Sequence, residues 1–133
     1  MPLPALPARV CPPAIIDASG LLLWMALPTR CGRVTAQHLL HSIGWSPGHH
    51  LDIQLRLGMV VITSAQDDRY QVGSRGELPL PASARHLCRI EPGQPVLLAA
   101  FITHDLLVVH PVGTVARLLT DLHRQLAGGD SDR

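Results

Sequence analysis

Lysine is absent from this chain of 133 residues, and all eleven basic side chains are Arg. A coding bias towards Arg explains this pattern, and so does phosphate recognition by bidentate guanidinium groups. The formal net charge is only +1, whereas nucleic-acid-binding domains usually carry a strongly basic face. Any basic surface on this protein must therefore be local.

Aromatic residues and long apolar runs are also scarce. The chain has one Phe, one Tyr and two Trp, so Leu, Val, Ile and Ala must fill the core. No apolar run approaches the roughly 20 residues that a membrane span needs. The 47% hydrophobic and 16% charged content is typical of a globular protein, and we expect no membrane partner.

Cysteine usage excludes two classes of small protein. Cys11, Cys31 and Cys88 are an odd number at wide spacing without a CxxC pair, which argues against a disulfide framework and a zinc knuckle. The first residues are rich in Pro and lack the charged start and apolar block of a secretory signal. We expect residues 1–17 to form a flexible tail and the protein to be cytoplasmic.

Motifs for catalysis and metal binding are missing. The sequence has no GxSxG, no P-loop and no paired carboxylates in one segment, so we expect no catalytic residues and no enzyme activity. Histidine is abundant at positions 38, 41, 49 and 50, but no HExxH or Cys pair accompanies it. We expect these side chains to face solvent or to be hydrogen-bonded, with no metal and no cofactor.

The chain contains the same unit twice. Residues 32–55 (GRVTAQHLLHSIGWSPGHHLDIQL) and 76–98 (GELPLPASARHLCRIEPGQPVLL) share one layout. An offset of 45 places Pro47-Gly48 on Pro92-Gly93 and Thr29-Arg30 on Ser74-Arg75, and one gap brings Gly32 onto Gly76. Self-similarity of this length indicates a repeat architecture.

Each copy reads as four short strands and one short helix. Strands are predicted at 20–27, 32–35, 50–57 and 59–64, then at 68–73, 76–80, 95–102 and 106–111, and helices at 36–44 and 81–89. Apolar residues alternate along 50–57, as in a half-buried strand. Gly44 ends the first helix, Pro81 opens the second, and a Pro-Gly turn follows each.

A unit of this size buries too little apolar surface to be stable alone. We therefore expect the first repeat (18–64) and the second (65–111) to pack into one pseudo-twofold domain, mainly β with short helices. The linker between the repeats is short, which allows strands to be exchanged between the halves.

The pattern of the second copy runs through Gly76, Leu78, Leu80, Pro81, Arg85, Leu87, Ile90, Pro92 and Gly93, and the first copy keeps Gly32, Arg33, Val34, Leu39, Ile43, Gly44, Pro47 and Gly48. This pattern resembles the AbrB/MazE/SpoVT family of small bacterial DNA-binding modules. Members of that family are typically dimers that interleave into a swapped-hairpin β-barrel. The resemblance implies two tandem copies that form such a barrel within one chain.

The resemblance also implies a function and a set of contact residues. The function is DNA-binding transcriptional regulation, with double-stranded DNA as the partner and the nucleoid as the location. By position, the contacts are Arg33 in the first copy and Arg85 in the second, with Arg30 and Arg75 on the same loops. Arg89 is a further candidate. Such side chains can contact phosphates and read guanine edges.

Departures from the family pattern leave alternatives open. Glu77 stands where the family has Arg, and Leu40 or His41 stands where the first copy would have its helical Arg. The two halves are thus asymmetric, and a DNA site need not be palindromic. The Arg residues could instead only solvate the rim of the barrel. A protein-interaction module, antitoxin-like or a scaffold, with weak or no DNA binding, is the second hypothesis.

Residues 112–127 predict a C-terminal helix. Its apolar residues recur at helical spacing, Thr114 is the expected N-cap, and Gly128-Gly129 is the expected end. The apolar residues are Val112, Val115, Leu118, Leu119, Leu122 and Leu126. This helix either covers an open apolar edge of the barrel or binds a partner or a second copy. Residues 128–133 are expected to be disordered.

Overall fold

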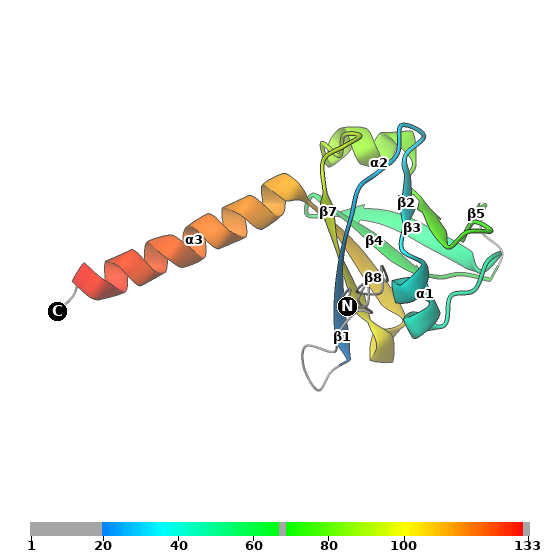
Figure 1. The fold of residues 1–133 in the computed structure, drawn as a ribbon, viewed down its shortest axis with the longest axis horizontal. Helices are drawn as coiled ribbons and strands as arrows, with labels where there is room; N and C mark the ends of the chain where they lie inside the picture. Colours follow the sequence, from blue (N-terminus) through cyan, green and yellow to red (C-terminus); the bar gives the residue numbers. More distant parts are fainter. Residues whose placement is uncertain (1–19, 67–68, 132–133) are drawn as a thin grey trace, which may run out of the picture.

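The computed structural model describes residues 20–66 and 69–131, so the predicted N-terminal tail (1–17) lies outside the described residues. The fold of these residues is mainly β, with a long C-terminal helix (Figure 1). The strands are β1 (Leu21–Ala26), β2 (Arg33–Thr35), β3 (His50–Arg56), β4 (Met59–Ser64), β5 (Tyr70–Gln71), β6 (Glu77–Pro79), β7 (Val96–Phe101) and β8 (Leu106–Pro111). The helices are α1 (Gln37–Ile43), α2 (Ala82–Leu87), the 3-10 helix η1 (Ile102–His104) and α3 (Val112–Ser131).

The strands form two antiparallel sheets, and the strand order of the larger sheet is palindromic with respect to the two repeats. One sheet has the order β1-β7-β8-β4-β3-β5, and the other consists of β2 and β6. The first strand of each repeat pairs with the hairpin of the other repeat, β1 with β7 and β5 with β3. If each strand is replaced by its equivalent in the other repeat, the same strand order is read in reverse. This is the relation expected of a pseudo-twofold axis.

The register of two strand pairs places this axis. Val34 pairs with Leu78 at the centre of the β2–β6 ladder, and Val61 pairs with Val108 in the β4–β8 ladder. Leu78 is the counterpart of Val34 in the other repeat. Val108 is the counterpart of Val61, because each lies three residues before the end of its strand, at Pro111 in β8 and at Ser64 in β4. Hydrogen bonds repeat the relation: the Ala36 amide donates to the Gly76 carbonyl at 3.0 Å, as the Leu80 amide donates to the Gly32 carbonyl at 2.8 Å.

These bonds correct one part of the predicted alignment. The Thr29 amide donates to the Arg33 carbonyl, and the Gly73 amide donates to the Glu77 carbonyl, so Thr29 corresponds to Gly73 rather than to Ser74. The placement of Thr29-Arg30 on Ser74-Arg75 was therefore wrong by one residue. The cause is the extra residue of the second repeat, which lies at the start of α2 and not in the turn.

The core is shared by the two repeats. Its largest fully buried side chains come from strands and helices of both repeats: Trp45, Leu39, Leu40, Leu51, Ile62, Leu78, Leu98, Leu107, Val34, Val60, Val96 and Val109. A polar contact also crosses between repeats, because Nε1 of Trp45 donates to Oδ1 of Asp105 at 2.7 Å. Burial on this scale is what a half of the chain could not reach alone.

Local sequence signals predicted most elements correctly. The two Pro-Gly turns are present, with positive φ at Gly48 (87°) and Gly93 (82°), as a turn with Pro before Gly requires. The predicted strand 68–73 is short, since only Tyr70–Gln71 pair with β3. The backbone of Val72 bonds instead to Gly48 and His49, at the turn of the first repeat.

The C-terminal helix differs from the prediction in its limits and its place. It begins at Val112, directly after β8, so Thr114 lies inside the first turn, and it continues through Gly128-Gly129 to Ser131. A Gly costs a helix about 1 kcal/mol relative to Ala, which weakens the helix without ending it. Residues 128–131, expected to be disordered, are thus helical, and 132–133 lie outside the described part.

This helix also does not cover the sheet. It leaves β8 and points away from the body of the protein (Figure 1). Leu118 and Leu126 are 61% and 62% exposed. The prediction that the helix covers an apolar edge is therefore wrong, because its direction at Pro111 carries it off the sheet.

The two sheets do not close into a barrel among the residues that the structure describes, since the β2–β6 sheet is separate from the six-stranded sheet. The AbrB-type barrel therefore stays a prediction. Among the described helices, none is long and apolar enough to cross a membrane.

Substitution of Gly76 tests the contact between the repeats. Gly76 has φ of +72°, and a methyl group there would lie 2.8 Å from Cα of Gln37 on α1. We expect Gly76→Ala to lower the free energy of unfolding by about 2–4 kcal/mol, because a left-handed conformation and a backbone clash both oppose Ala. Gly93→Ala is the control: φ is +82° and nothing lies within 4 Å. Urea denaturation should show a clearly smaller loss for the control, and equal losses would contradict the contact.

His110 predicts a pH dependence of stability. Its Nδ1 is buried without a hydrogen-bond partner, and burial lowers its pKa below the ordinary value. The unfolded chain therefore takes up a proton at a higher pH than the folded chain, so stability falls as pH drops below about 6.5. Between about pH 7.5 and pH 5.5 the melting temperature of the wild type should fall more than that of His110→Leu. Parallel decreases in both proteins would show that His110 does not contribute.

Candidate nucleic-acid interface

The ribbon formed by β2 and β6 presents a small polar face. Val34 and Leu78, on its inner side, are fully buried, whereas Arg33 and Thr35 on the outer side are exposed. Glu77 and Pro79 share that outer side from β6 and are half-buried. Strand alternation thus places Arg33 on the surface while its neighbour anchors the ribbon in the core.

Arg33 and Glu77 occupy equivalent positions on this ribbon, and their charged groups both lie close to Gly73. A methyl group at Gly73 would lie 2.9 Å from Oε1 of Glu77 and 3.2 Å from Nη1 of Arg33. Gly73 therefore leaves the space in which both charged groups lie. The carboxylate reduces the positive potential of the guanidinium, so the outer face is only locally basic.

The two turns beside the ribbon carry the next pair of predicted residues. Arg30 and Arg75 are exposed in these turns, Thr29–Gly32 and Gly73–Gly76. Because β2 and β6 are antiparallel, the turns lie at opposite ends of the ribbon. Arg30 and Arg75 therefore flank Arg33 from two sides. Arg75 corresponds to Cys31 of the first repeat, so these two Arg side chains are not symmetry mates.

One residue of this surface was missed by the sequence analysis. Arg69 is exposed and lines a hollow of about 720 Å³ together with Arg33, Tyr70 and Ser74. It lies next to β5, which pairs with β3 of the other repeat. The sequence signal was only an Arg at the start of a short alternating segment, and the exchange of strands is what brings it to the ribbon.

Arg85 lies on α2 and is partly engaged by the fold. Its Nε donates to the carbonyl of Leu80 at 3.0 Å, and its guanidinium packs over Gly32. The corresponding residue of the first repeat is the buried Leu40, because Trp45 bonds to the Leu40 carbonyl as Ile90 bonds to that of Arg85. Arg85 thus holds the Thr29–Gly32 turn against α2, whatever else it contacts.

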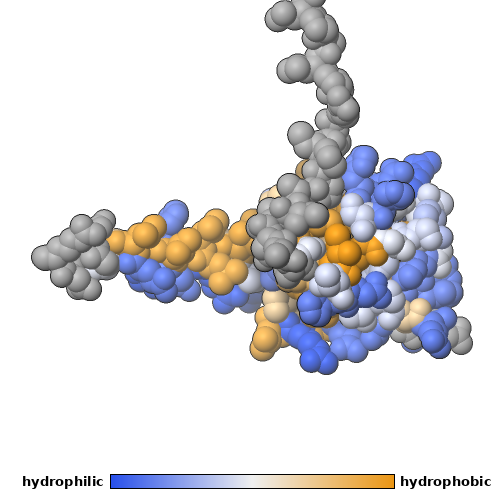
Figure 2. Space-filling view, turned by 90° about the horizontal axis from the view of Figure 1, so that it is seen from below, coloured by the Kyte–Doolittle hydropathy of each residue, from blue (hydrophilic) through white to orange (hydrophobic). Residues whose placement is uncertain are grey.

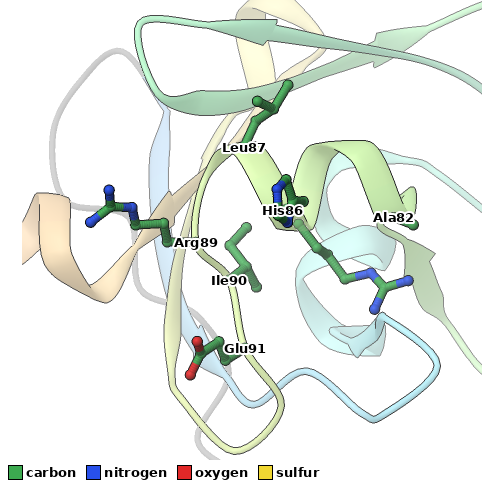
Figure 3. Close-up of a pocket in the computed structure, with 7 residues that line it drawn as sticks. Ala82, His86, Leu87, Arg89, Ile90 and Glu91 are labelled. Carbon is green, nitrogen blue, oxygen red and sulfur yellow. The ribbon is translucent and has the colours of Figure 1, made fainter.

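Arg89 is not brought to the ribbon. Its guanidinium points towards the beginning of α3 (Figure 3), and it lines a hollow there with Leu87, Val112 and Arg117. Its φ is +55°, and the corresponding position of the first repeat is Gly44, with φ of +87°. This is the left-handed position that ends a helix and favours Gly.

The structure also describes His and Cys side chains outside the ribbon. In the described part of the chain, no three side chains of His, Cys, Asp or Glu converge in a way that could hold a metal ion. His49 is hydrogen-bonded to Ser64 at 2.7 Å and stacks on Trp45 with ring centroids 5.7 Å apart. Burial raises the pKa of the Cys88 thiol, which keeps it protonated and unreactive at neutral pH.

Substitution of Arg89 tests whether its left-handed backbone conformation destabilises the fold. We expect Arg89→Gly to raise the free energy of unfolding by about 1 kcal/mol, because Gly removes the cost of the left-handed conformation. Arg89→Ala is the matched control, since it removes the same charge and keeps the strain. Urea denaturation should show the gain only with Gly. Equal stabilities of the Gly and Ala variants would contradict the strain.

Comparison of the chain with protein-family models, with curated proteins and with solved structures finds no match.

Proposed function

We propose that this protein is a DNA-binding transcriptional regulator of the AbrB type, acting in the cytoplasm at the nucleoid. The observation that supports this most directly is the β2–β6 ribbon, which exposes Arg33 and is flanked by Arg30 and Arg75. A two-stranded ribbon is narrow enough to enter the major groove of DNA. Arg side chains on such a ribbon can bind phosphates or the edge of guanine.

The palindromic strand order gives the proposal further support. Exchange of β1 and β5 between the repeats is the arrangement expected of an AbrB-type dimer contained in one chain. The swapped-hairpin barrel belongs to this proposal.

The polar residues at equivalent positions of the two repeats predict an asymmetric DNA site. Arg33 of the first repeat is replaced by Glu77 at the equivalent position of the second. A carboxylate repels the phosphate backbone, so the contact on the ribbon itself comes from β2 rather than β6. The recognised sequence should therefore not be a palindrome.

A salt titration and a variant pair test the proposal. We expect the protein to enrich a sequence from a random pool of duplex DNA at about 50 mM salt and to bind far more weakly at about 200 mM. If Arg30, Arg33, Arg69 and Arg75 all contact phosphates, the slope of log affinity against log salt is about −3.6. The double variant Arg33→Ala, Arg75→Ala should lose about half of that slope and the enriched sequence.

The matched control is Arg117→Ala, Arg124→Ala, which removes the same charge from α3, away from the ribbon (Figure 1). This control should bind DNA like the wild type. Equal losses in both double variants would show a nonspecific charge effect and contradict contact through the ribbon. No binding by the wild type at the lower salt would exclude DNA as the partner.

The second candidate is a protein-interaction module, antitoxin-like or a scaffold. Two observations favour it: the carboxylate of Glu77 on the ribbon and the exposed leucines of α3. This candidate predicts that the wild type fails the DNA test although it is folded. Neither candidate requires a cofactor or a catalytic residue.

A further inference from the structure

Helix α3 carries an apolar stripe that nothing in the described structure covers. Its exposed fractions are 61% at Leu118, 50% at Leu119 and Leu122, and 62% at Leu126. Figure 2 shows these apolar residues gathered along one side of the helix, which extends away from the body. Only the first turn lies against β7 and β8, where Val115 is half-buried. A row of exposed leucines on a projecting helix is unfavourable in water without a partner.

The spacing of the stripe indicates what kind of partner fits. Val112, Val115, Leu119, Leu122 and Leu126 follow one another at intervals of three, four, three and four residues. These intervals are the a and d positions of a heptad repeat, the pattern of a helix that pairs with another helix. Leu118 lies beside this seam and widens the stripe by one residue.

The flanks of this seam carry no charge that would oppose a second identical helix. Leu118 and Gln125 lie on one flank, and Ala116 and His123 on the other. The charged side chains within residues 112–126 are on the far side of the helix, where Arg124 lies 3.6 Å from Asp121 and both are well exposed. Asp130 follows the seam, four residues after Leu126. A symmetric dimer brings each surface against its own copy, so an uncharged flank is what such a contact needs.

The body of the protein adds one exposed leucine at the base of α3. A hollow of about 600 Å³ lies there, lined by Leu87 and Val112 but also by Arg89 and Arg117. Leu87 is 67% exposed. A second copy can therefore bury more than the two-heptad seam itself, which matters because short helix pairs are marginally stable.

A membrane surface fits this helix less well. Helices that bind in a membrane interface combine Trp or Phe on the apolar side with many Lys or Arg on the polar side. Residues 112–131 contain no Trp, Phe, Tyr or Lys, and Arg117 and Arg124 are partly offset by Asp121 and Asp130.

We propose that α3 pairs with α3 of a second copy of this chain through the seam formed by Val112, Val115, Leu119, Leu122 and Leu126. Two pseudo-twofold bodies are then joined by a helical stalk. The pairing is weak because the interface is short, so monomer and dimer exchange at micromolar concentrations. This proposal does not depend on DNA binding. If the protein does bind DNA, the stalk joins two ribbons and raises their combined affinity for neighbouring sites.

Sedimentation velocity of the full chain tests the pairing, from low to several hundred micromolar, with two variants that each add one positive charge to α3. Leu122→Lys places it in the seam, and Thr120→Lys places it outside the seam. We expect wild type and Thr120→Lys to shift from monomer to dimer as concentration rises. Leu122→Lys should raise the dissociation constant roughly tenfold or more, since a charge would be buried. Far-UV circular dichroism checks that each variant is folded.

Two outcomes would overturn the proposal. A wild type that stays monomeric at the highest concentration would show that the stripe does not pair with a second copy. Its occupant would then be another protein or residues 1–19 of the same chain. A Leu122→Lys variant that dimerises like the wild type would place the dimer contact elsewhere. The DNA test on Leu122→Lys remains separate, because the ribbon is unchanged in this variant.

Discussion

The pairing of β2 with β6 is the interaction on which the rest of the structure depends. Each strand is only three residues long, and Val34 and Leu78 anchor both in the core at the pseudo-twofold axis. The same pairing places Gly32 against α2 and Gly76 against α1, where the two equivalent backbone hydrogen bonds form. Neither repeat can satisfy these backbone groups or bury its apolar strand by itself, so the halves fold together.

The backbone of the two repeats is arranged symmetrically, but their polar side chains are not. Arg33 corresponds to Glu77, the buried Leu40 to Arg85, and Gly44 to Arg89. At each of these positions the backbone keeps the same path while the chemistry differs. The buried positions of both repeats are apolar because the shared core requires it, whereas the surface positions are free to diverge. This is why the proposed contact on the ribbon itself falls on β2 and why the DNA site is expected to be asymmetric.

Helix α3 stands outside this symmetric arrangement. The helix departs from β8, points away from the sheet and exposes its leucines. The ribbon and the helix are thus separate surfaces of one molecule, one polar and locally basic and the other apolar and free of charge along its seam. A protein with both surfaces can join an electrostatic contact to a hydrophobic one, and each can be removed without disturbing the other.

The sequence by itself determined what depends on near neighbours. Alternation marked β3, Pro-Gly pairs marked the turns, and helical spacing marked α3, because these signals act within a few residues. Self-similarity also showed that two copies must share a core. Only the tertiary structure decided where Arg69 lies, that Arg85 packs over Gly32, that Thr29 corresponds to Gly73 and that α3 leaves the sheet. These features arise from ladders and packing between segments far apart in the chain, and no local pattern of residues encodes such contacts.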